Sequence, residues 1–139
     1  MPRHTLFAYV EGNDLDDIAP ALEPRLDRFV RDTRWRYADP WVVNQRREDD
    51  PSLRPGDLPD WDLGLNMHLP DDEPPGWFAD IEALVKFLGP LQEQIGRAFV
   101  LGISDNERGF TEDLPFEIDS RAPDLALLRR VLGVNDGAT

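Results

Sequence analysis

Residues 62–69 alternate between large apolar side chains and small or polar ones, which is the periodicity of a β-strand that buries one face. The apolar series occupies every second position: Leu63, Leu65, Met67 and Leu69. The intervening series is Gly64, Asn66 and His68. Such a strand needs a layer of other elements over its apolar side, so the chain must contain a sheet with at least one covered face.

Four other segments also predict strands, because they are short and rich in aromatic and β-branched residues. These segments are Thr5–Val10, Trp41–Arg46, Ala98–Ile103 and Leu114–Ile118. Residues 98–103 are nearly all apolar, which indicates a central strand or one that is covered on both faces.

Three regions carry apolar residues at the 3.6-residue spacing of an amphipathic helix. They cover residues 15–34, 77–88 and 123–132. In the first region, Pro20 or Pro24 is expected to mark the start of the regular helix, because proline fits only the first turn. In the second, Gly89 and Pro90 are expected to end or kink the helix before a short helical piece over 91–95.

The order of these segments is strand, helix, strand, strand, helix, strand, and then one more strand and helix. A βαββαβ unit is the split βαβ or ferredoxin-like motif, in which two helices cover one face of an antiparallel sheet. We therefore predict an α+β, ferredoxin-like fold with a C-terminal strand and helix added. The opposite face would carry Phe7, Tyr9 or their neighbours beside Asn66 and His68. Either the last helix or an interface should cover that face, because large apolar patches are rarely left in water.

Length and composition predict one folded domain over residues 1–139, since compact domains of this size are common. Hydrophobic residues make up 40% of the chain, which excludes global disorder. The polar, proline-containing stretch 47–60 predicts a long solvated loop, and residues 134–139 predict a frayed tail. The chain has no cysteine, which excludes disulfides and thiolate catalysis.

The chain is strongly acidic, with 28 Asp and Glu against 15 Lys and Arg and a net charge of −13. A nucleic-acid partner is excluded, because such a site needs a basic footprint. The acids concentrate in two stretches, residues 47–82 with a balance of −9 and residues 104–119 with a balance of −5. We expect no membrane contact and a cytoplasmic location, because no export signal and no apolar run of ~18 residues is recognisable.

In the predicted fold, the acidic connections gather as rims at the two ends of the sheet. The acids that follow the third strand are Asp71, Asp72 and Glu73, and those of the long loop at the other end are Glu48, Asp49 and Asp50. A rim of one sign speeds the encounter with an oppositely charged protein. Trp61, at the exit of the long loop, is a candidate anchor for such a partner. The alternatives are that the acids serve solubility alone and that Trp61 covers the edge of the core.

No nucleotide-binding or nucleophile motif is present, and the only histidines are His4 and His68. We therefore expect no catalytic residue, no cofactor and no bound metal. One alternative is a small metal- or ligand-dependent enzyme that uses His68 with Asp71 or Asp72. The other is a plain α+β domain that forms a homodimer through its open sheet face.

Two short segments carry a resemblance to a known class of proteins. They are Pro74-Pro75-Gly76-Trp77-Phe78 and Gly102-Ile103-Ser104-Asp105-Asn106. Together with the acidic connections of a cysteine-free single domain, they make the chain similar to the small immunity proteins of bacterial secreted (polymorphic) toxin systems. The resemblance implies a stoichiometric, non-catalytic inhibitor that binds a cognate toxin and blocks its active site or substrate access. Toxins that act on nucleic acids or nucleotides have cationic clefts, which an acidic rim would complement.

Overall fold

The computed structural model describes residues 3–46, 51–55, 60–72 and 74–133. Its elements, in chain order, are β1 (His4–Val10), α1 (Ala19–Asp32), β2 (Trp41–Arg46), β3 (Trp61–His68), α2 (Phe78–Ile95), β4 (Phe99–Asp105), β5 (Phe110–Ile118) and α3 (Leu125–Val131). The strands form one antiparallel sheet in the order β2-β3-β1-β4-β5. The prediction of an α+β fold with an antiparallel sheet and a C-terminal strand and helix is confirmed.

β1 is the central strand of the sheet, with β3 on one side and β4 on the other. Leu6 pairs with Met67 of β3 and with Ile103 of β4. β2 and β5 form the two edges, and β5 is irregular where it pairs with Val100 and Gly102.

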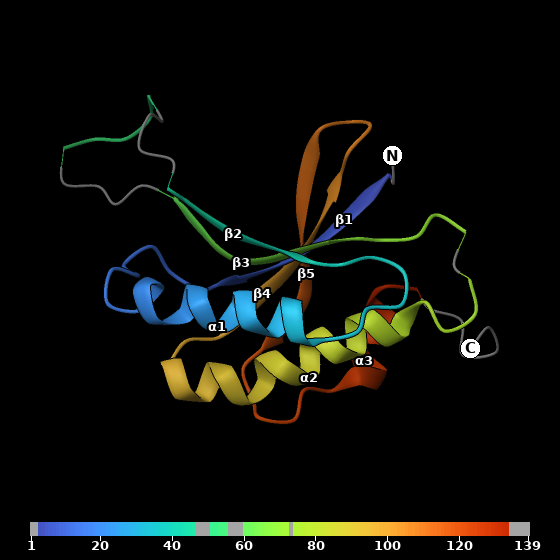
Figure 1. Cartoon of the computed structure of the whole chain (residues 1–139). Helices are drawn as coiled ribbons and strands as arrows, with labels where there is room; N and C mark the ends of the chain where they lie inside the picture. The colour runs from blue at the N-terminus through green and yellow to red at the C-terminus, as the bar shows by residue number, and fades with distance from the viewer. Residues whose placement is uncertain (1–2, 47–50, 56–59, 73, 134–139) are drawn as a thin grey trace.

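The three helices all pack against the same face of the sheet (Figure 1). α1 contacts β2 and β3, whereas α2 and α3 contact β5. Arg129 joins α3 to α2: its Nη2 donates to Glu82 Oε1 at 3.0 Å, and its guanidinium lies 4.4 Å from the centre of the Phe78 ring. The C-terminal helix therefore does not cover the opposite face, which was one of the two alternatives that the sequence left open.

The core lies between this sheet face and the helices. The strand residues buried in it come from alternate positions: Leu6, Ala8, Val10, Leu63, Leu65, Met67, Phe99 and Leu101. The helices contribute a second series: Leu22, Leu26, Phe78, Ile81, Leu84, Leu88 and Leu128. Full burial of a side chain of this size is worth about 1.5–3 kcal/mol, and a one-residue slip would expose a whole strand's series. The buried alternation therefore determines the register.

α1 begins close to the first of its two prolines. It starts at Ala19, so that Pro20 lies in the first turn, where its missing N–H has no helical partner to lose. Pro24 lies inside the helix, and burial of Leu22 and Leu26 holds the helix to the sheet on either side of it.

Of the two predicted effects of Gly89 and Pro90, an end or a kink, the structure corrects the first, together with the separate short helical piece over residues 91–95. α2 is one helix that continues to Ile95 with Pro90 inside it, and it ends at Gly96, whose φ is 72°. Gly89 does not end the helix; it allows another segment of the chain to pack closely against it. A Cβ at this position would lie 2.5 Å from the carbonyl oxygen of Arg121, so the glycine lets the chain before α3 cross directly against the helix.

Two other predicted segments differ in how far the structure describes them. Within the predicted loop 47–60, residues 51–55 form no helix or strand, and residues 47–50 and 56–59 lie outside the described part. The predicted tail 134–139 also lies outside it.

β5 begins at Phe110, four residues before the predicted start. The first half of this strand has no apolar pattern that would predict it, and it is defined by its pairing with β4.

Candidate functional site

The sheet face opposite the helices is open in the described structure (Figure 1). Because Leu6 and Leu65 point into the core, the alternate positions of the same strands point outward, and they include Phe7, Tyr9 and Asn66. The aromatic and imidazole members of this open face are Phe7, Tyr9, Trp41 and His68, and its acidic members are Asp62, Asp113 and Glu117. The sequence left open whether Phe7 and Tyr9 or their neighbours share this face with Asn66 and His68, and the register places Phe7 opposite Asn66 and Thr5 opposite His68.

Phe7 and Tyr9 form the centre of the open face. Their rings stack with centroids 4.7 Å apart, and the Tyr9 hydroxyl donates to Asn66 Oδ1 at 2.6 Å. Phe7 lies over its cross-strand partner Gly102, where a Cβ would come within 2.0 Å of the Phe7 ring. The glycine therefore creates the space in which this aromatic pair lies flat against the sheet.

A second cluster lies near the ends of β2 and β3. The indole of Trp41 packs on His68 with ring centroids 4.8 Å apart, and Trp41 remains 39% exposed. His68 Nδ1 lies 3.1 Å from Thr5 Oγ1, which also accepts a hydrogen bond from Asn106 Nδ2 at 3.0 Å. The hydrogen bonds hold the imidazole in place, so Trp41 presents its exposed surface on a fixed support.

A groove of about 530 Å³ runs along the open face beside Phe7 and Tyr9. Its acidic lining residues are Glu11, Asp60, Asp62 and Asp113, and no arginine, lysine or histidine is among the lining residues that the structure describes. Aromatic ring faces attract cations, and carboxylates form charge-assisted hydrogen bonds with them. The groove therefore offers the two kinds of group that bind a guanidinium or an ammonium.

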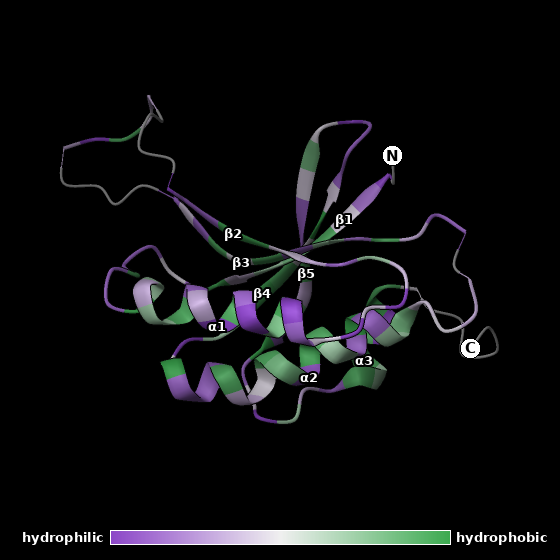
Figure 2. Ribbon diagram, in the orientation of Figure 1, coloured by the Kyte–Doolittle hydropathy of each residue, from purple (hydrophilic) through white to green (hydrophobic). Residues whose placement is uncertain are grey.

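The charge of the sheet supports the same interpretation. Arg46 is the one arginine or lysine within the bounds of the five described strands, and its guanidinium lies 4.7 Å from the centre of the Trp61 ring. Asp113 and Glu117 are exposed and have no ion pair within 4.0 Å among the described residues. In Figure 2 the middle of the sheet is mostly hydrophobic, and the strand ends and connections are mostly hydrophilic.

At the end of the sheet where β1 begins, several carboxylates bind groups of the chain itself. Asp71 Oδ1 accepts from the Arg3 backbone N–H at 3.1 Å, and Arg3 Nη2 lies 3.5 Å from Asp105 Oδ2. Asp105 Oδ1 accepts from the backbone N–H groups of Arg108 and Glu107, both at 3.0 Å. These hydrogen bonds, that of Arg108 foremost, together with the charge of Arg3, lower the pKa of Asp105.

At the other end of the sheet, acids are paired with arginines. Asp14 accepts from both Nη atoms of Arg97 at 2.9 Å, and these bonds lower the pKa of Asp14. Asp16 lies 3.8 Å from Arg46. Acids among the described residues therefore lie at both ends of the sheet, and a part of their charge is used within the fold.

The predicted binding residues are not brought together in the described structure. Asp71 and Asp72 are exposed beyond the last residue of β3, whereas Trp61 is its first residue. Trp61 is 8% exposed, its indole N–H donates to Asn44 Oδ1 at 2.6 Å, and the residue belongs to the core cluster as well as to the lining of the groove. Little of its surface is left for a partner to cover. The remaining predicted residues, Glu48, Asp49, Asp50 and Glu73, lie outside the described residues.

Sequence reasoning did not single out Asp113, Glu117 or Trp41 as binding residues. Asp113 precedes the predicted limits of its strand, and Trp41 was named only as the first residue of one. The available signal was that Thr111, Asp113 and Glu117 share one parity of β5, but the first half of this strand has no apolar series to reveal which face they occupy.

The alternative of a metal-dependent site has no ligand set in residues 3–46, 51–55, 60–72 and 74–133, where no group of three histidine or acidic side chains could hold an ion. His68 points to the open face, as does its cross-strand partner Thr5. His4 precedes Thr5 in β1 and therefore points to the opposite face. The two imidazoles thus lie on opposite sides of the sheet.

In the part of the chain that the structure describes, no helix has the length and apolar character required to span a bilayer. Comparison with protein-family models, with curated proteins and with solved structures yields no match.

Proposed function

We propose that this protein is a non-catalytic, immunity-type inhibitor that docks its open sheet face on a cationic surface or active site of a bacterial toxin. The observation that carries the proposal is the groove beside Phe7 and Tyr9, which combines stacked aromatic rings with four carboxylates and has no basic residue among its described lining residues. A surface of this kind complements arginine and lysine and repels polyanions.

The two kinds of group would act at different stages of binding. The net charge of −13, with the predicted acidic rims that include Asp71 and Asp72, would raise the rate of encounter with a cationic protein. Phe7, Tyr9 and Trp41 would then supply the contact area that loses water on docking. Trp61 would act as a buried wall of the groove, and its predicted role as an anchor stays a prediction.

Fold and location form part of the same proposal. We propose that the first six elements follow the ferredoxin-like split βαβ arrangement, with β5 and α3 as an addition, and that the inhibitor acts in the cytoplasm. The strand order β2-β3-β1-β4 and the antiparallel pairing of all neighbours support the fold assignment. In such a fold the sheet is a rigid support for its open face.

A homodimer through the same face has less support. Two copies that meet face to face would bring Asp62, Asp113 and Glu117 of one chain toward the same residues of the other, and like charges at a contact oppose association. Light scattering at several protein concentrations tests this alternative.

The proposal is tested with the toxin domain of a large secreted protein encoded in the reading frame directly upstream. We expect a 1:1 complex that inhibits the toxin and whose association slows as salt is added. The double variant Asp113→Asn/Glu117→Gln should slow association about tenfold at low salt. The matched control Asp17→Asn/Asp27→Asn removes two exposed charges on the helix side and should slow it less than about twofold. Equal effects of the two variants, or an association rate that is independent of salt, would contradict the proposal.

A further inference from the structure

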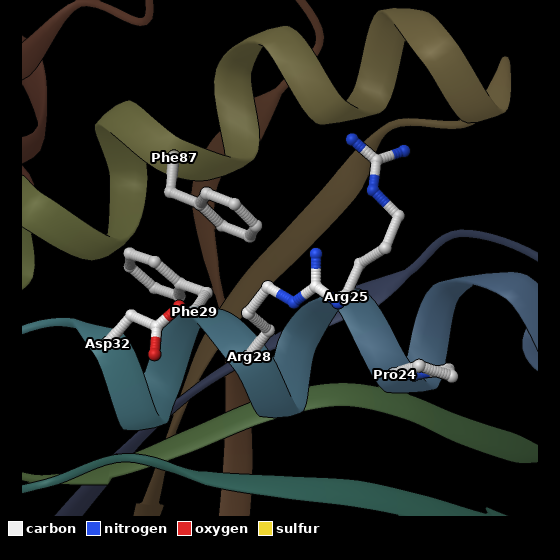
Figure 3. Close-up of a pocket in the computed structure, with 6 residues that line it drawn as sticks. All are labelled: Pro24, Arg25, Arg28, Phe29, Asp32 and Phe87. Atoms are coloured by element: carbon white, nitrogen blue, oxygen red, sulfur yellow. The ribbon is translucent and has the colours of Figure 1, made fainter.

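A second groove, of about 370 Å³, lies between α1 and α2 (Figure 3). Its apolar part is formed by Phe29 of α1 and Phe87 of α2, whose rings stack in parallel with centroids 3.9 Å apart and an interplanar angle of 3°. Both side chains are only half-buried, so the ring pair is accessible from the groove.

The other part of the groove is cationic. Arg25 and Arg28 extend from α1 toward α2, as Figure 3 shows, whereas Asp32 lies beside Phe29 at the opposite end. Arg25 Nη2 donates to Gln94 Oε1 at 2.6 Å, which orients the guanidinium without neutralising it. Neither arginine has an acidic partner within 4.0 Å among the residues that the structure describes. On a chain with a net charge of −13, two arginines without such partners beside an aromatic pair are a local reversal of charge.

We propose that this groove binds a small molecule that has an apolar body and one carboxylate. The body would lie on the ring pair of Phe29 and Phe87, and the carboxylate would accept hydrogen bonds from the guanidiniums of Arg25 and Arg28. The volume lies near the lower end of the roughly 300–1,000 Å³ of ligand pockets, so the ligand is small. Asp32 lies at the apolar end of the groove, where it repels a carboxylate. It therefore favours the orientation in which the carboxylate of the ligand lies at the arginine end.

This groove differs from the sheet face in charge and location, and the proposal does not depend on the inhibitor role. A polyanion would meet the acidic remainder of the surface, and an inorganic anion would leave the aromatic pair unused. The combination of an apolar part and a cationic part is what points to an apolar carboxylate.

The test is a titration of ¹⁵N-labelled protein with 4-phenylbutyrate, with octanoate and with the neutral 4-phenylbutanamide, followed by the amide chemical shifts. We expect both acids to shift the amides of residues 25–32 and 84–91, and the neutral amide to bind at least about tenfold more weakly. Arg28→Gln should remove most of this preference for the acid. The control Arg31→Gln changes an exposed arginine of the same helix that lines a different depression, and it should retain the preference.

Thermal melting of both variants shows whether they keep the fold, so that a loss of binding in Arg28→Gln is assigned to the lost guanidinium. If only one of the two acids binds with this preference, the proposal holds and the body is aromatic or aliphatic accordingly. Equal binding of acid and amide, shifts at other residues, or no shifts at millimolar ligand would overturn it.

Discussion

The two faces of the sheet are built from alternate residues of the same strands, and they differ in almost every physical property. Toward the helices, Leu63 and Leu65 are 0% exposed and belong to one continuous core. Toward solvent, the same strand carries Asp62, Asn66 and His68, and the last two form hydrogen bonds or ring contacts with neighbouring strands. The comparison teaches that the covered face determines stability and register, which leaves the open face free to carry residues suited to recognition.

Carboxylates show the same contrast. Asp80, on the helix side, is 5% exposed and binds the backbone N–H groups that follow α1. Asp113 and Glu117, on the open face, are exposed and have no ion pair among the described residues. A buried carboxylate of this kind organises the fold, and the exposed ones contribute mainly to the surface potential.

The comparison of faces predicts that neighbouring positions of β3 differ sharply in cost. Leu65→Ala should lower the free energy of unfolding by about 3 kcal/mol, because it leaves a cavity in the core. Asn66→Ala should cost about 1 kcal/mol, since the Tyr9 hydroxyl loses an acceptor at 2.6 Å. Urea unfolding of both variants measures the difference. Similar costs at the two positions would mean that the open face is as important for stability as the core.

The contrast between carboxylates is sharpened by Asp80→Ala. Asp80 accepts from the backbone N–H groups of Arg36 at 2.7 Å, Tyr37 at 2.8 Å and Ala38 at 3.4 Å, so the variant leaves three donors without their partner. We expect a loss of about 2 kcal/mol in unfolding free energy. Asp80→Asn keeps one acceptor oxygen and should cost less, and Asp113→Asn should stay within about 0.5 kcal/mol of the parent. An Asp80→Ala variant as stable as Asp113→Asn would show that the buried carboxylate has no organising role.

A smaller effect is expected from the pH dependence of Asp105. Its pKa is lowered in the folded chain, foremost by the backbone N–H of Arg108, so the ionised form stabilises the fold. This contribution is complete above the unfolded pKa of about 3.9 and is lost as the pH falls through the lower folded value. The drop in melting temperature between pH 7 and pH 3 should therefore be smaller in Asp105→Asn than in the parent. An equal drop in the two proteins would remove Asp105 from the acid response.

Elements with a strong local pattern could be predicted closely. The second strand has the predicted limits, Trp41–Arg46, and the alternating strand is displaced by one residue. The continuation of α2 through Pro90 could not be predicted, because Gly89 is required by the chain at Arg121, which the local sequence does not reveal. The first half of β5 is polar and exposed, so only its pairing with β4 defines it.

The candidate site was predictable in character but not in position. The sequence named Phe7, Tyr9 or their neighbours for the uncovered face, and the composition indicated an acidic surface. The groove itself depends on Phe7 lying over Gly102, two residues that are brought together by the central pairing of β1 with β4. No local signal identifies such a pair, and therefore the sequence pointed to acids in the connections instead.

The central place of β1 has a consequence for the time course of folding. During synthesis β1 leaves the ribosome first of the five strands, yet Thr5 finds its two partners only when His68 and then Ser104 have been added. Until β3 has been made, this apolar segment has no neighbour on either side, and until β4 has been made it has a neighbour on one side only. Such long separations between partners slow a folding reaction. The nascent chain therefore carries β1 with at least one unpaired edge until Ser104 has been added, which is the interval in which a chaperone would bind it.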